Sequence, residues 1–222
     1  MIHQTDADLV VLQEAVRQES VARIAEAAGL GHYMSAAGRS LAFISRAPVA
    51  HYEWHKPRRS RHAFLEILPV DGGCRLFGVH LSAVHSAWTE QRRMFELRAL
   101  LSAIARQQHG CHMLIGDFNT LAPGEVLDAS LLPTRLRMLV WLSGGRIRWR
   151  TVRRILDSGY VDGFRSSNPG VPGFTFPVWN PHLRLDYAFV PSRYEPRLRR
   201  CEVVTSDAAK EASDHFPILV EI

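Results

Sequence analysis

Short apolar runs that each adjoin an acid, a histidine or an amide recur along this chain, and they constrain its fold more than any other feature. The stretch "HMLI" is followed directly by "GDFN", so Asp117 and Asn119 end a run with the character of a buried strand. Turn chemistry is one explanation, because Asp and Asn side chains hydrogen-bond neighbouring backbone groups and often end strands. The alternative is that both side chains lie at the open edge of a sheet, where a reaction takes place.

The same pattern occurs elsewhere in the chain. Glu14 follows "DLVVLQ", His80 follows "LFGV", Asp186 lies within "RLDYAFV", and Asp214 and His215 precede "FPILVEI". Taken singly, each of these residues is more often a solvated strand cap or an ordinary packed side chain. Together with the "GDFN" pair they supply acids, histidines and an amide, which is the set that metal-assisted attack on a phosphate requires.

The chemistry of the side chains suggests a role for each. Mg²⁺ takes carboxylate and water oxygens, so Glu14 and Asp214 are candidate ligands of Mg²⁺, or of Mn²⁺ in its place. A histidine held by a carboxylate can move protons near neutral pH, which suits Asp186 and His215. Phosphoryl transfer also needs hydrogen bonds to oxygens on which charge builds. The Asn119 amide and the His80 imidazole are expected to make them.

Periodicity places these residues on a mixture of strands and helices. Strands are expected at 8–12, 40–46, 63–70, 74–83, 111–119, 185–190, 201–207 and 216–222, and helices at 20–28, 89–108 and within 152–165. The polar segment 51–62 is expected to be a loop or a sheet edge. Because the strands come in hairpin-like groups, a layered α/β sandwich is favoured over a regular alternation of strand and helix.

At this point the motifs carry a resemblance. In order, "LQEA" (12–15), "VHLSA" (79–83), "IGDFNT" (115–120), "RLDYAFV" (184–190) and "ASDHFPI" (212–218) resemble those of the endonuclease/exonuclease/phosphatase superfamily. That superfamily includes pancreatic-type deoxyribonucleases, abasic-site endonucleases and neutral sphingomyelinases. The resemblance implies a DNase I-like fold, a four-layered α/β sandwich of two mostly antiparallel sheets flanked by helices. It spans nearly the whole chain, 1–222, as a single domain.

The resemblance also implies residue roles. Glu14 matches the family's metal-binding acid, and the acid before the histidine of "SDH" lies near the metal. Asp117 and Asn119 match the pair at the scissile phosphate, with Asp117 orienting or activating the water. Asp186 matches the acid that orients His215. The role of general base stays open between Asp117 and His215, and Phe118 is expected to point into the core.

The chain departs from the family pattern at its beginning. Members usually start with a central strand that carries an Asn, ahead of the "QE" motif, whereas only 13 residues precede Glu14 here. The N-terminal strand is therefore expected to be missing from the domain, which would expose backbone groups of its neighbours. A start site placed too late, a true truncation and a rearranged sheet are the three explanations.

The sequence features that bear on the substrate are less specific than those that bear on the fold. "VHLSA" differs from the version in abasic-site endonucleases, which places the chain nearer the deoxyribonucleases, sphingomyelinases and tyrosyl phosphodiesterases. Trp179 could stack on a base at the mouth of the site, or it could simply pack below a loop. The basic clusters 56–62, 146–154 and 193–200 could line a groove for nucleic acid, or they could be solvated faces. The segment 136–145 could contact a membrane surface, which is the weaker interpretation.

Composition limits the class of protein. Hydrophobic residues make up 46% and charged residues 22% of the chain, as in ordinary globular proteins. Three widely spaced cysteines argue against a disulfide framework and suit a reducing compartment. No signal-peptide architecture or membrane-length apolar run is visible, so a cytoplasmic protein is expected. A net charge of +5 favours an anionic partner.

The combined hypothesis is a Mg²⁺-dependent hydrolase of phosphoester bonds, with a slight preference for a nuclease because of the positive charge. A small-molecule or lipid phosphodiesterase or phosphatase of the same superfamily is the alternative. A non-catalytic binding protein that kept the fold is the third interpretation. The absent strand favours this last one, whereas the complete set of polar residues opposes it.

Overall fold

The computed structural model describes residues 1–58, 60–83, 87–106, 110–125, 128, 130, 134, 137–138 and 149–222, without the side chains of 87, 88 and 106. Most of the segment 136–145, for which a membrane contact was considered, lies outside the described residues. The same holds for Arg59 and for 146–148 of the basic clusters. No helix within the described part of the chain is long and apolar enough to cross a membrane.

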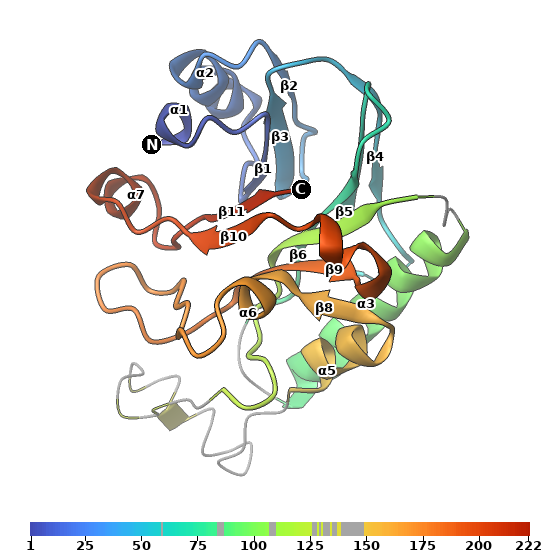
Figure 1. Ribbon diagram of the computed structural model, residues 1–222, viewed down its shortest axis with the longest axis vertical. Coiled ribbons are helices and arrows are strands. Elements are labelled where there is room, and N and C mark those ends of the chain that lie inside the picture. Colours follow the sequence, from blue (N-terminus) through green and yellow to red (C-terminus); the bar gives the residue numbers. More distant parts are fainter. Residues whose placement is uncertain are drawn as a thin grey trace.

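A six-stranded sheet forms the centre of the fold (Figure 1). Its strand order is β4 (Val49–His55), β5 (Phe64–Pro69), β6 (Arg75–His80), β7 (His112–Asp117), β9 (Asp186–Pro191) and β8 (Tyr160–Asp162). All neighbours are antiparallel except β6 and β7, which run parallel. A parallel pair needs a long crossover, and helix α3 (Ala87–Arg106) provides it. The parallel pairing brings the carboxyl ends of β6 and β7 together.

The remaining strands form two smaller sheets. One has the order β1 (Leu9–Gln13), β3 (Leu41–Ser45) and β2 (His32–Met34), and the other pairs β10 (Arg200–Val203) with β11 (Ile218–Glu221). Among the described residues β1 is therefore paired on one side alone, with β3. The short helices are α1 (Ile2–Thr5), α6 (Gly163–Ser167), the 3₁₀ helix η2 (Ser192–Arg197) and α7 (Asp207–Ala212).

Apolar cores hold the layers together. Helix α2 (Gln18–Ala28) packs Val21 and Ala25 against β3, and the opposite face of β3 packs Phe43 against Leu65 of β5. Helices α3 and α5 (Arg150–Asp157) cover the far face of the large sheet, and Leu97 of α3 lies in the core between these helices and the sheet. Helices α1 and α2 lie on one side of the two strand layers and α3 and α5 on the other (Figure 1). This is the α/β sandwich that the sequence predicts.

Most predicted elements are confirmed, with their ends shifted by a few residues. The polar segment 51–62 contains the edge strand β4, as one of its two interpretations stated. Within 152–165 the helix ends at Asp157, and β8 and α6 follow. The strand predicted at 201–207 ends at Val203, because the Ser206 hydroxyl accepts a hydrogen bond from Ala209 N and starts α7. The last strand begins at Ile218, since Phe216 N donates to a loop carbonyl instead.

Two glycines allow β1 to approach the large sheet closely. A Cβ atom at Gly78 would lie 2.7 Å from Val11 Cγ1, and one at Gly116 would lie 3.1 Å from Gln13 Nε2 and 2.1 Å from the Val79 carbonyl oxygen. Gly116 also has a φ of 136°, which side-chain-bearing residues rarely adopt. The absence of side chains at these positions lets the end of β1 reach the ends of β6 and β7.

Replacing Gly116 should therefore destabilise the protein. In Gly116→Ala the new methyl group meets a backbone oxygen that cannot move without disturbing β6, so we expect a loss of more than about 2 kcal/mol in the free energy of unfolding. Urea unfolding measures this loss. Gly31→Ala is the control, because a Cβ atom there meets nothing within 4 Å and the φ is ordinary. Equal stability of the two variants would contradict the close approach.

Candidate functional site

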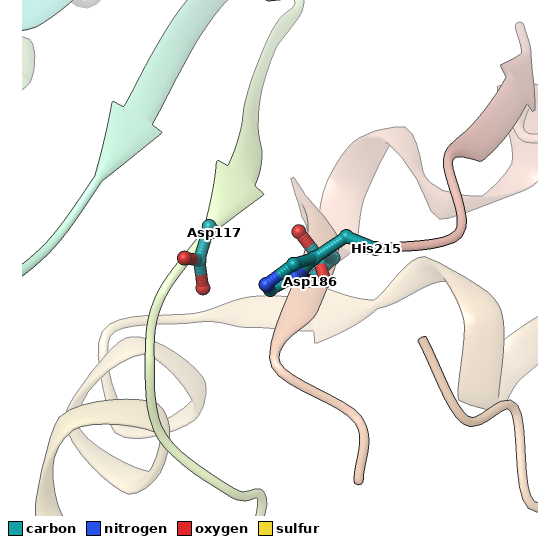
Figure 2. A group of neighbouring side chains, drawn as sticks. All are labelled: Asp117, Asp186 and His215. Carbon is teal, nitrogen blue, oxygen red and sulfur yellow. Dashed lines mark hydrogen bonds and ion pairs between the residues drawn. The ribbon is translucent and has the colours of Figure 1, made fainter. Parts of the chain in front are cut away.

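The ends of β7 and β9 bring two carboxylates together. Asp117 is the last residue of β7, Asp186 is the first of β9, and the antiparallel register makes them direct partners. His215 enters from the loop before β11, and its ring lies beside both carboxylates (Figure 2). One ligand atom of each of the three residues lies within 4.8 Å of the others. The fold thus joins motifs that are far apart in the sequence.

His215 and Asp186 form a hydrogen-bonded pair, as predicted. His215 Nδ1 lies 2.8 Å from Asp186 Oδ2. A buried loop residue, Thr175, fixes both partners: its hydroxyl accepts a bond from Asp186 N at 3.3 Å, and its carbonyl accepts one from Phe216 N at 2.7 Å. The Phe176 ring lies 4.6 Å from the His215 ring and covers it. The imidazole is therefore held in a single orientation, with Nε2 left for other partners.

The electrostatic surroundings favour the protonated form of His215. Burial alone would lower its pKa, but the hydrogen bond and charge of Asp186, together with the charges of Asp117 and Asp214, raise the pKa to about 9. In the metal-free protein the imidazole consequently carries a proton at neutral pH. Such a group can donate a hydrogen bond or a proton to a phosphate oxygen.

Asn119 anchors Asp117. Its backbone N–H donates to Asp117 Oδ1 at 2.8 Å, and its side-chain nitrogen donates to Asp117 Oδ2 at 2.7 Å and to the Leu81 carbonyl at 2.9 Å. A φ of 51° makes this compact turn, in a region that Asn tolerates. Both amide hydrogens are occupied in this geometry. The predicted contact of this amide with a phosphate oxygen stays a prediction and requires one of these bonds to be exchanged.

Asp117 itself resists ionisation. Burial raises its pKa first of all, and the neighbouring charge of Asp186 raises it further. His80, the last residue of β6, places Nε2 3.9 Å from Asp117 Oδ2. Burial and the nearby His62 and His215 lower the pKa of His80 to about 4, so this imidazole is neutral at pH 7. A carboxylate with a raised pKa between one charged and one neutral imidazole is suited to proton transfer.

The two predicted metal ligands lie beside this group. Glu14 follows β1 with a φ of 56° and is exposed, and its charge raises the pKa of Asp117. Asp214 is exposed, and its charge raises the pKa of His215. Among the described residues, the group of three donor atoms consists of Asp117, Asp186 and His215 and includes neither of them. The structure therefore brings Glu14 and Asp214 to the site without assigning them a ligand role.

The donor set fits a hard divalent cation. Burial of Asp117 and the neighbouring charge of Asp186 both disfavour the ionised form of Asp117. A bound cation would stabilise that form, and carboxylate oxygens are the donors that Mg²⁺ and Mn²⁺ prefer. The exposed carboxylates of Glu14 and Asp214 leave room for the water ligands that Mg²⁺ retains.

Trp179 is separated from His215 by one aromatic ring. The residue is 73% exposed, and its ring lies 6.2 Å from that of Phe176, which in turn contacts the His215 ring. Packing below a loop was one of its two interpretations, and the high exposure argues against it. Contact with a substrate base stays a prediction.

Sequence reasoning missed the buried network behind the site. The Arg184 guanidinium contacts Asp162 Oδ2 and Glu125 Oε1, each at 2.6 Å, and lies over the Tyr187 ring at 4.5 Å. The Tyr187 hydroxyl donates to the Thr120 carbonyl at 2.9 Å, which fixes the loop after "GDFN". The Arg before "LDY" was a visible signal. Its acidic partners could not be identified, because they lie 22 and 59 residues away.

The fold and the site define a phosphoesterase-type α/β sandwich. Residues 1–215 match the model of the Endonuclease/Exonuclease/phosphatase family, and the chain belongs to this family. Its members are nucleases and phosphatases that act on phosphoesters. The resemblance seen in the sequence motifs is thereby confirmed.

Solved structures of similar fold agree with this membership. The 3' phosphatase NExo from Neisseria, bound to a product DNA hairpin, is 20% identical with a TM-score of 0.71 over 96% of this chain and 88% of that one. An AP endonuclease from Archaeoglobus fulgidus is 16% identical with a TM-score of 0.71 over 99% and 90%. An endonuclease/exonuclease/phosphatase from Beutenbergia cavernae is 21% identical with a TM-score of 0.70 over 99% and 63%. At these identities the likeness shows the fold. A search of curated proteins gives no significant match.

The His215–Asp186 pair has a measurable pH dependence. Because the folded-state pKa of about 9 exceeds the ordinary value of 6.5, the pair stabilises the metal-free protein fully below about pH 6.5. This contribution is lost as the pH rises through about 9. In Asp186→Asn we expect the pKa of His215 to fall towards its ordinary value. Proton NMR titration in EDTA measures the pKa, and the same pKa in both proteins would refute the coupling.

Proposed function

We propose that this protein is a divalent-metal-dependent phosphodiesterase whose substrate is a nucleic acid. The observation that carries this proposal is the convergence of Asp117, Asp186 and His215 at the strand ends of a family member. The chemistry of hydrolysis needs a proton acceptor for the attacking water, a proton donor for the leaving oxygen and compensation of phosphate charge. The described residues supply all three.

We assign the cation to the two exposed carboxylates beside the group of three. Glu14 is the proposed ligand, with Asp214 as the second, because Asp186 and His215 are already bonded to each other. Mg²⁺ is the proposed ion, and Mn²⁺ has the same preference for oxygen donors. When bound, the ion would polarise the phosphoryl oxygens and neutralise developing charge.

Proton movements are assigned from the pKa directions. Attack of water forms a new O–P bond, breaks the bond to the leaving oxygen, and moves one proton from the water to that oxygen. Asp117 in its ionised form is the proposed acceptor of the water proton, and its raised pKa makes this carboxylate a stronger base. His215, protonated at neutral pH, is the proposed donor to the leaving oxygen. His80 is neutral and is proposed to hydrogen-bond a non-bridging phosphate oxygen.

Two observations favour a nucleic acid over a small or lipid phosphodiester. The exposed ring of Trp179 lies one aromatic contact away from His215, where it could stack on a base. The fold neighbours include a 3' phosphatase that binds a DNA hairpin and an AP endonuclease. Hydrolysis of a small phosphodiester without any action on oligonucleotides would favour the alternative substrate class.

Removal of the His215 imidazole should abolish most of the activity. With Mg²⁺ present, we expect His215→Ala to lower kcat on bis(p-nitrophenyl) phosphate by about 10²–10⁴-fold, because the proton donor is lost. Release of p-nitrophenolate is measured with Mg²⁺, Mn²⁺ or EDTA. His32→Ala is the matched control, since His32 is exposed on β2 in another sheet. Full metal-dependent activity of His215→Ala would contradict the proposed mechanism.

The ligand assignment is testable without catalysis. We expect Glu14→Gln to weaken Mn²⁺ binding by about tenfold or more, because a charged oxygen ligand is replaced by a neutral amide. Isothermal titration calorimetry on the metal-free protein measures the affinity. Glu19→Gln, an exposed site on α2, serves as the charge-matched control. An unchanged affinity in Glu14→Gln with a loss in Asp186→Asn would assign the ion to the group of three instead.

A further inference from the structure

A buried carboxylate holds the segment 60–62, in the loop between β4 and β5, next to the site. Glu96 of α3 accepts a hydrogen bond from Arg61 N at 3.3 Å. The same carboxylate accepts bonds from Ser82 N at 3.2 Å and Ser82 Oγ at 3.1 Å. Ser82 lies two residues after His80, so one side chain fastens the loop to the end of β6.

This arrangement places His62 against the site. The Ser60 hydroxyl donates to the His62 carbonyl at 2.6 Å and fixes the turn. The His62 ring then lies 4.9 Å from the His80 ring at an angle of 34°. Since His80 lies 3.9 Å from Asp117, His62 is one ring removed from the proposed reaction centre. His62 is half-buried, so part of its edge faces solvent.

Three basic residues lie close enough to His62 to affect its pKa. Burial is the first cause that lowers the pKa of His62 and of His80. The charge of Glu96 raises the pKa of His62, whereas the charges of Arg61, Lys56 and Arg92 lower it, and Arg61 also lowers the pKa of His80. The carboxylate facing this cluster is that of Glu96, and it is already engaged by the loop and by β6. Within the described part of the chain, no carboxylate forms an ion pair with Lys56, Arg61 or Arg92. The basic residues around His62 are therefore available to pair with an anion.

We propose that His62 and Arg61 form a second phosphate subsite that binds the phosphodiester next to the scissile one. The inference rests on the proposed function and narrows the substrate class to a polynucleotide strand. Arg61 would contribute a charged, forked donor and His62 a ring N–H, which together suit a singly charged phosphodiester. Such a subsite contributes to binding only if the substrate carries a second phosphate. A small diester has none.

A rival explanation is that His62 merely supports the His80 ring. In that case loss of His62 would disturb the reaction centre itself and lower hydrolysis of every substrate by the same factor. The two explanations therefore differ in how the loss depends on substrate length.

The experiment compares two substrates in the full-length protein with Mg²⁺. For His62→Ala and Arg61→Ala, we expect the fall in kcat/KM on a single-stranded oligodeoxynucleotide to exceed that on bis(p-nitrophenyl) phosphate by tenfold or more, mainly through KM. Arg23→Ala is the charge-matched control. Arg23 is exposed on α2, which packs against β3 of the three-stranded sheet, and it belongs to none of the basic clusters. Equal losses on both substrates, or none, would overturn the subsite.

A binding measurement separates this inference from the proposed function. Fluorescence anisotropy of a labelled oligodeoxynucleotide is measured on His215→Ala in EDTA, where no cleavage is expected. Adding Arg61→Ala should weaken binding and reduce the slope of log K against log salt concentration by about one. That result supports the subsite even if the parent protein hydrolyses nothing, which would refute the proposed function alone. An unchanged affinity and slope would overturn the subsite even if hydrolysis is observed.

Discussion

The rest of the site depends on the contact between Asp117 and Asp186 across β7 and β9. The antiparallel register makes these acids direct partners, and burial together with the charge of Asp186 raises the pKa of Asp117. The protonated His215 compensates part of this charge through its 2.8 Å bond to Asp186. A bound cation would compensate more. The ends of β7 and β9 thus hold an excess of negative charge that favours the binding of a cation and of a proton. Phosphoester hydrolysis uses both.

This charge excess persists because buried polar contacts fix its geometry. Thr175 holds the backbone of Asp186 and of the residue after His215. Arg184 is buried and pairs with Asp162 and Glu125. On the other side, Glu96 fastens the loop of His62 to the end of β6. Hydrogen bonds between buried polar groups favour one arrangement of the backbone, because breaking them would leave those groups unpaired at a cost in free energy.

Sequence reasoning succeeded where a signal is local. The apolar run before "GDFN" predicts a buried strand over 111–119, and β7 is that strand, from His112 to Asp117. Phe118 was expected in the core and is fully buried. Reasoning failed where a contact joins distant segments. The sequence places His62 in a basic cluster, and nothing near it in the sequence indicates its contact with the His80 ring. The partners of Arg184 were missed for the same reason.

The sequence by itself determined the class of the protein. Strand-ending acids, histidines and an amide, in the order of five motifs, are sufficient to predict the α/β sandwich and a phosphoesterase family. Only the tertiary structure decided which of these groups touch. The register of β7 against β9 pairs Asp117 with Asp186, and β1 approaches them because Gly78 and Gly116 lack side chains. Distances, burial and therefore pKa directions arise from packing between segments, and a linear pattern carries no information about them.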